Sequence, residues 1–135
     1  MIYALDTNII SFLLRAERNP KVVMRFAFEI EQGNDYVIPP LSYYEITWYL
    51  LRKKATTQLR YFHDLYQNAF VKSGMNESDL SLAAQIRANL EEHGNLIGDA
   101  DILIAAYCIA NDYTLVTDNT SDFERIKRLK FVNWK

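Results

Sequence analysis

Four short apolar runs, separated by segments with helical spacing, organise the chain. The runs are IYAL at the N-terminus, YVIP with a strand expected over 36–38, TLVT from Thr114, and FVNW from Phe131. Apolar residues between them recur at helical intervals, which predicts helices in IISFLL and over 20–32, 42–53, 57–71, 78–93 and 100–111. Parallel strands need crossover connections, which are usually helices. We therefore expect an α/β fold, a three-layer α/β/α sandwich around a central, mainly parallel sheet.

The length and apolar content fit one globular domain over residues 1–135. Half of the 135 residues (50%) are hydrophobic, which suits one sizeable core. No apolar run approaches the ~18 residues of a membrane span, and the N-terminus lacks signal-peptide features, so we expect a soluble, cytoplasmic protein. The lone Cys108 lies in ILIAAYCIA, which indicates a buried apolar role and excludes an intrachain disulfide. The net charge of −2 is not that of a basic nucleic-acid-binding domain.

Several carboxylates stand directly after the predicted strands or near the starts of predicted helices. An α/β sheet gathers its functional groups at such positions. In such sheets the site lies outside the carboxyl ends of the strands, which here are followed by Asp6 in LDTN and Asp118 in LVTDNTSDF. Two further candidates are Glu45 in PPLSYYEIT and Asp101 in IGDADILIAA, where Asp99 is a neighbour. We therefore treat these regions as the candidate site.

Two of these acids have a competing structural interpretation as helix caps. Asp6 could cap the helix after the first strand, but Thr7 and Asn8 are also good capping residues, so capping alone would not require Asp6. Ser42 and Glu45 have the S-x-x-E spacing of a capping box, in which both satisfy free amides of the helix. Taken alone, that interpretation is the better one for Glu45.

For Asp101 and Asp118, the structural alternatives to a functional role are different. Asp101 stands near the start of a helix that is apolar on nearly every face, so its carboxylate must be capped, paired or metal-bound. Asp99 follows Gly98 and is the natural N-cap, which leaves Asp101 for another role. Asp118 fits an ordinary turn and a site equally well, and Asn119 competes with it. We interpret the nearby Asp122 as a cap or turn residue.

A cluster of carboxylates indicates metal chemistry. Converging carboxylates raise each other's pKa unless a divalent cation neutralises them, and hard oxygen ligands suit Mg²⁺ or Mn²⁺. Such ions activate a water and stabilise the leaving oxygen of a phosphodiester. The chain's two histidines, His63 on a helical stripe and His93 beside Gly94, are interpreted as structural or surface residues, which argues against a histidine-based ribonuclease.

The ordered motifs resemble the PIN domain. LDTN after an N-terminal strand, a glutamate about 40 residues on, G-x-x-D-x-x-I-A-A and L-V-T-x-N-x-x-x-F occur in this order. The likeness covers essentially the whole chain, including the terminal FVNW. It is closest to VapC-type toxins, the ribonuclease half of toxin–antitoxin pairs.

This resemblance implies roles for individual residues and partners. Asp6, Glu45 and Asp101 correspond to the three core acids that bind Mg²⁺ or Mn²⁺ and activate water. The fourth acidic position falls at Asp118 or Asn119, and Thr117 matches a residue that supports the site. The resemblance further implies endonucleolytic cleavage of RNA, a homodimer, and a cognate antitoxin whose tail covers the site.

The sequence leaves alternatives open. An aspartate-nucleophile phosphatase usually needs a second acid two residues on, where this chain has Asn8. A degenerate PIN fold acting as a binding module conflicts with the intact acids. Most aromatic residues between 42 and 70 should be core, with a few forming a dimer or antitoxin surface. Basic residues after two helices could contact phosphates, or they could equally form a solvated face: Arg15, Arg18, Arg52, Lys53 and Lys54.

Overall fold

The central sheet is parallel throughout. The computed structural model describes residues 1–135, with strands β1 (Ile2–Leu5), β2 (Asp35–Val37), β3 (Thr114–Val116) and β4 (Phe131–Val132). The strand order is β2-β1-β3-β4, and each neighbouring pair is parallel. The sequence prediction of a parallel sheet is therefore confirmed.

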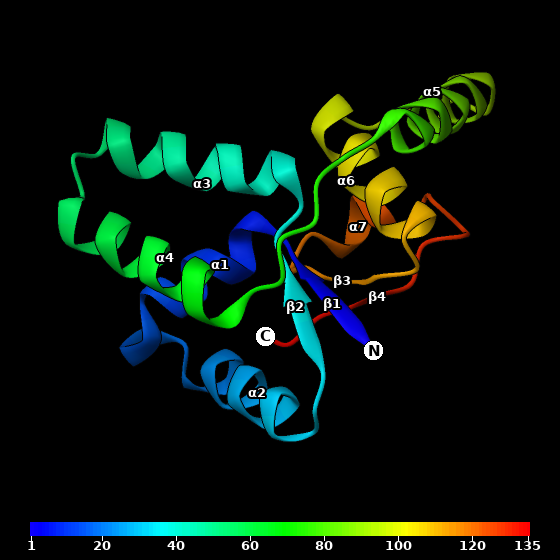
Figure 1. The fold of residues 1–135 in the computed structure, drawn as a ribbon. Helices are drawn as coiled ribbons and strands as arrows, with labels where there is room; N and C mark the ends of the chain where they lie inside the picture. Colours follow the sequence, from blue (N-terminus) through cyan, green and yellow to red (C-terminus); the bar gives the residue numbers. More distant parts are fainter.

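Helices cover both faces of this sheet (Figure 1). They are α1 (Thr7–Leu14), α2 (Pro20–Glu31), α3 (Pro40–Arg52), α4 (Thr56–Ala69), α5 (Glu77–Glu92), α6 (Asp99–Ala110) and α7 (Thr120–Phe123), with a 3₁₀ turn at Ala16–Arg18. Alternate residues of β1 enter different cores, because successive strand side chains point to opposite faces. Tyr3 and Leu5 pack with α1 to α4, whereas Ala4 packs with α5 to α7. The α/β/α sandwich is confirmed.

The register brings the ends of β1 and β3 together. Leu5 pairs with Val116, the Asp6 N–H donates to the Val116 carbonyl (3.0 Å), and the Thr117 N–H donates to the Val132 carbonyl (3.0 Å). Asp6 and Thr117 therefore leave the same edge of the sheet, as the sequence predicts from the carboxyl ends of parallel strands.

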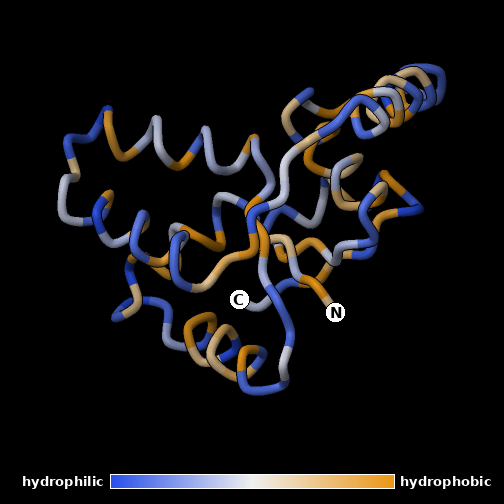
Figure 2. The backbone as a smooth tube through the Cα atoms, in the orientation of Figure 1, coloured by the Kyte–Doolittle hydropathy of each residue, from blue (hydrophilic) through white to orange (hydrophobic).

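The buried side of α2 includes a charged residue, Glu29. The buried residues are Val22, Phe26 and Glu29, whereas Ile30 is 48% exposed. Glu29 is accommodated because Arg25 (2.8 Å) and Asn34 (2.6 Å) donate to its carboxylate. Met24, Phe28 and Ile30 of α2 are exposed, and Figure 2 shows hydrophobic residues along this helix.

One helix end is shorter than expected. α4 ends at Ala69, because Phe70 is extended (φ −118°, ψ 139°) and the Val71 N–H donates to the Tyr36 carbonyl (2.8 Å). The lone Cys108 is buried, as predicted. None of the helices is both long and apolar enough to cross a membrane.

Candidate active site

Asp6 is a buried carboxylate held by donors from three parts of the chain. It is 4% exposed and accepts hydrogen bonds from the Thr7 N–H (2.8 Å), the Thr117 hydroxyl (2.8 Å), and more weakly from Ser42 and Asn8 (3.4 Å each). Burial raises its pKa, and these hydrogen bonds partly oppose that shift.

Of the three capping candidates in LDTN, Asp6 caps α1, and Thr7 and Asn8 do not. Asp6 itself occupies the N-cap position, with extended backbone (φ −71°, ψ 163°). Only its Oδ1 serves the helix amide, however, while Oδ2 accepts from Thr117 and Asn8. Capping therefore accounts for one oxygen of the carboxylate. The other oxygen contacts Thr117, at the end of β3.

The predicted capping box of Ser42 and Glu45 is not formed. α3 begins at Pro40, with Pro39 as its N-cap and no side-chain cap, because proline is favoured in the first turn of a helix. The buried Ser42 hydroxyl donates instead to Asp6 (3.4 Å). Glu45 Oε1 accepts from the Thr7 hydroxyl (3.1 Å). Both residues thus connect α3 to the end of β1.

Asp101 faces the end of β3, but Asp99 does not cap α6. The N-cap of α6 is Gly98, and Asp99 is the first helical residue. The exposed Asp99 carboxylate forms an ion pair with Arg87 (2.8 Å), so the N-cap prediction for Asp99 is wrong. The half-buried Asp101 accepts a hydrogen bond from the Asn119 side chain (3.2 Å).

Asp118 and Asp122 lie in different surroundings. The Asp118 N–H donates to Asn8 (2.9 Å), while its carboxylate accepts from Asn133 (3.0 Å) and lies 3.6 Å from the Lys135 ammonium. Asp118 thus contacts the C-terminal segment.

Asp122 is the acid that sequence reasoning missed. The Asn119 amide donates both to Asp101 (3.2 Å) and to Asp122 (3.3 Å), which places the two carboxylates on either side of it. Asp122 stands in the first turn of α7, a position that the sequence alone presents as a cap. The signal that could have found it is an acid one helical turn after a strand end in the candidate region.

The acids act on one another electrostatically at Asp101. Its pKa is raised to about 6, first by burial and then by the charges of Asp6, Asp122 and Glu45, together with a hydrogen bond to Asp122. This set of carboxylates, joined by hydroxyl and amide oxygens, is the donor chemistry that hard divalent cations prefer. No three carboxylate, imidazole or thiol side chains are arranged to hold an ion in this structure. The fit to a cation therefore rests on donor chemistry and on the repulsion among the acids.

The raised pKa of Asp101 predicts a pH-dependent cost to stability. The folded protein holds this proton up to about pH 6, whereas the unfolded chain releases it near the ordinary value of 3.8. Stability should therefore fall as pH rises through this interval. In chelator, Asp101→Asn should melt above the wild type at about pH 7.5, and the two should converge near pH 4.

Thermal melts of both proteins across this pH range provide the measurement. Asp99→Asn is the matched control, since Asp99 is exposed and paired with Arg87. A constant difference between Asp101→Asn and the wild type at every pH would contradict the prediction.

The histidines take no part in this cluster. His63 and His93 are both exposed, and His93 Nδ1 lies 2.8 Å from the Asn89 carbonyl oxygen. Neither hydrogen-bonds to an acid of the site, which agrees with their interpretation as surface residues.

Comparison with known proteins gives full-length matches. The sequence matches the PIN domain over residues 3–129. It is similar to Ribonuclease VapC2 of Rickettsia felis, with 28% identity over 99% of this chain and 98% of that protein. It is also similar to the tRNA(fMet)-specific endonuclease VapC of Shigella flexneri, with 29% identity over 98% of this chain and 97% of that protein.

The fold comparison agrees. The toxin-like chain in the crystal structure of VapBC2 from Rickettsia felis, bound to a promoter DNA fragment, superposes with a TM-score of 0.87 at 27% identity, and each chain is covered completely (100%). VapBC-1 of nontypeable Haemophilus influenzae gives a TM-score of 0.83 at 25% identity, covering 99% of this chain and 98% of that one. The chain therefore belongs to the PIN-domain family, within the VapC-type ribonuclease toxins of toxin–antitoxin systems.

Proposed function

We propose that this ribonuclease cuts RNA endonucleolytically with Mg²⁺ or Mn²⁺ held by Asp6, Glu45 and Asp101. The observation that carries the proposal is the gathering of acids around Asp101. One Asn119 amide donates to both Asp101 (3.2 Å) and Asp122 (3.3 Å), and burial with the charges of Asp6, Asp122 and Glu45 raises the pKa of Asp101 to about 6. Such a group destabilises the free protein near neutral pH and is relieved by a divalent cation. When bound, the cation would lower the pKa of a water and stabilise the leaving oxygen.

The chain's own residues would position this machinery. Thr117 and Ser42, both fully buried, donate to Asp6 and fix its two oxygens. The Thr7 hydroxyl orients Glu45. These donors would orient the carboxylates toward a bound cation.

The fourth acidic position has two candidates. The sequence predicts Asp118 as a catalytic residue, and its place directly after β3 supports that role. Asp122 is supported by its contact with Asn119, which joins it to Asp101 (3.3 and 3.2 Å). We propose Asp122 for this position, since the Asp118 carboxylate already contacts Asn133 and Lys135.

We also propose a cognate antitoxin and a homodimer for this chain. The similar proteins of Rickettsia felis and Haemophilus influenzae were solved as VapBC assemblies. Exposed apolar residues on α2 provide a surface that a partner could cover: Met24 (72%), Phe28 (50%) and Ile30 (48%).

Metal binding and cleavage should share one concentration dependence. Adding Mn²⁺ or Mg²⁺ to the chelator-treated protein should raise its melting temperature, because a ligand of the folded state stabilises it by about 2.7 kcal/mol at 100 times its Kd. RNA cleavage should rise over the same metal concentrations. The measurement is a thermal shift titration beside initial rates of RNA cleavage.

Asp101→Asn should lose most of the thermal shift, while Asp99→Asn should keep it. Full cleavage in chelator by the pure wild-type protein would refute the proposed metal dependence.

A further inference from the structure

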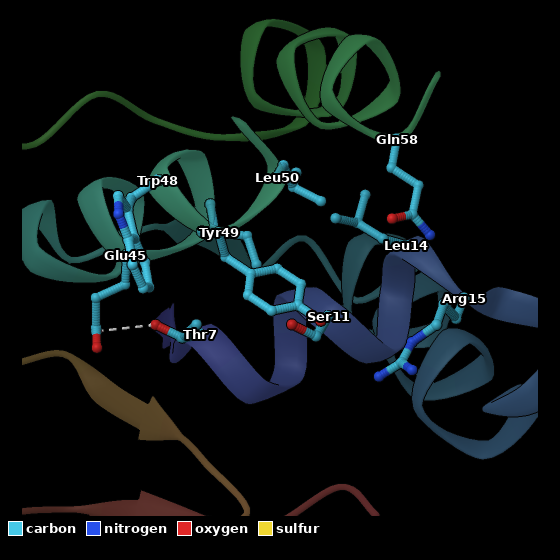
Figure 3. Close-up of a pocket in the computed structure, with 10 residues that line it drawn as sticks. Thr7, Ser11, Leu14, Arg15, Glu45, Trp48, Tyr49, Leu50 and Gln58 are labelled. Carbon is cyan, nitrogen blue, oxygen red and sulfur yellow. Dashed lines mark hydrogen bonds between the residues drawn. The ribbon is translucent and has the colours of Figure 1, made fainter. Parts of the chain in front are cut away.

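A cavity of about 350 Å³ opens directly beside the carboxylates. It lies between α1, α3 and α4, and two residues of the candidate site, Thr7 and Glu45, form part of its wall. Figure 3 shows these two at one end, Arg15 and Gln58 at the other, and the Tyr49 ring between them. A ligand at this end of the cavity would therefore contact the hydrogen-bonded pair of Thr7 and Glu45 (3.1 Å).

Two aromatic residues of the wall are exposed. Trp48 is 50% exposed and Tyr49 is 42% exposed, so neither is explained by core packing. The Arg52 guanidinium lies 4.6 Å from the Trp48 ring and 5.8 Å from that of Tyr49, and the Lys53 ammonium lies 5.7 Å from Tyr49. Exposed rings beside cations are the elements with which proteins bind unpaired bases and the adjoining phosphates.

Polar groups at the far end of the cavity can read a base edge. Gln58 offers both a donor and an acceptor, and Ser11 adds a hydroxyl. Arg15 lines the same end, is exposed, and forms no ion pair. An amide beside aromatic rings suits the hydrogen-bonding edge of a planar nucleobase.

We propose that this cavity binds one unpaired nucleobase of the RNA, next to the phosphate that is cut. The base stacks on Trp48 or Tyr49, Gln58 contacts its edge, and Arg15 and Arg52 contact flanking phosphates. The proposal rests on the proposed function, because it assumes that RNA lies across the carboxylates. It explains how an acidic chain, with a net charge of −2, holds RNA locally, and it makes sequence choice depend on a single-stranded nucleotide.

The wall of the cavity is continuous with the carboxylate site, because Glu45 belongs to both. This continuity favours an RNA base over a protein segment as the ligand. An RNA chain that crosses the carboxylates can place a neighbouring base in the cavity while it still contacts Glu45. Cations also lie close by, as a polyanion requires: Arg15 lines the cavity, and Arg52 and Lys53 lie beside the rings of its wall.

The test uses one RNA with a mapped cut in a single-stranded region, and copies with an abasic nucleotide at each flanking position. For wild type, one abasic position should lower kcat/KM by roughly tenfold to a hundredfold, the value of one stacked base. Trp48→Ala should show a similar loss on intact RNA and little further loss on the abasic copy, since the two changes remove one interaction. Trp48→Phe should restore most of the rate.

Tyr44→Ala is the matched control, because Tyr44 is on the same helix, is 67% exposed and does not line the cavity. Equal cleavage of intact and abasic RNAs by wild type, with Trp48→Ala unaffected, would overturn the proposal. So would a Trp48→Ala protein that cuts RNA normally but binds its antitoxin more weakly, because the cavity would then belong to a protein partner.

A binding experiment separates failure of this proposal from failure of the proposed function. If wild type cuts no RNA with metal, the proposed function fails, and the cavity is tested through tryptophan fluorescence of the Asp101→Asn protein. The second tryptophan, Trp134, is only 3% exposed, so quenching by RNA reports on Trp48. Quenching by intact but not abasic RNA supports the cavity, and its absence overturns it.

Discussion

Asp101→Asn is expected to cut RNA at least ~100-fold more slowly than the wild-type protein, and Asp6→Asn is expected to do the same. Each change removes the charge of a proposed metal ligand from a cluster in which the charge of Asp6 raises the pKa of Asp101. Each also relieves repulsion among the acids, so the fold should survive. Initial rates on RNA at saturating Mg²⁺ or Mn²⁺, beside circular dichroism and thermal melts, measure both effects.

Asp99→Asn provides the control for this comparison. Asp99 lies two residues before Asp101 on the same helix, but its carboxylate is exposed and contacts Arg87 (2.8 Å). Its loss should change stability by no more than about 0.5 kcal/mol and should leave cleavage intact. Unchanged cleavage by both purified Asp6→Asn and Asp101→Asn proteins would refute the site assignment.

The same series tests Glu45 and the fourth acid. Glu45 does not cap α3, since Pro39 occupies the N-cap, so Glu45→Gln should lose activity without the ~0.5–2 kcal/mol cost of a lost cap. A fully active Glu45→Gln protein with a lowered melting temperature would contradict this. Asp122→Asn should impair cleavage more than Asp118→Asn, and the reverse order would restore Asp118 to the site.

The arrangement of strands could be predicted because it depends on local pattern. Short apolar runs between helical segments predict a parallel sheet, and such a sheet gathers the residues after its strands at one edge. Asp6 and Thr117 lie at that edge because Leu5 pairs with Val116. This part of the site could be located without any side-chain contacts.

Helix starts were the part that local pattern could not predict. Ser42 has the spacing of a cap, yet its hydroxyl turns to Asp6, 36 residues away. Gly98 is the N-cap of α6 and provides no side-chain cap, and Asp99 instead contacts Arg87 on another helix. Capping propensity is worth about 1 kcal/mol, so a tertiary contact of similar size can displace it. Asp122 was missed for the same reason, because its cap-like position concealed its contact with Asn119.

RNA cut by the wild-type protein is expected to carry 5′-phosphate and 3′-hydroxyl ends. In the proposed mechanism an activated water attacks phosphorus, so the RNA 2′-hydroxyl is not the nucleophile. The residues favour this route, because several acids surround Asp101 and raise its pKa, while His63 and His93 are exposed and take no part. A ribonuclease that uses general acid and base residues on the 2′-hydroxyl would leave a cyclic phosphate and ignore a chelator.

Ligation of the products distinguishes these routes without a structure. Downstream fragments should accept a 5′ adapter directly, with no prior kinase treatment, and upstream fragments should accept a 3′ adapter with no phosphatase treatment. The Asp101→Asn protein, prepared in the same way, controls for contaminating ribonucleases, which would cut in both preparations. Cyclic-phosphate ends produced in EDTA by the wild type, but not by Asp101→Asn, would refute the hydrolytic mechanism while leaving the fold unaffected.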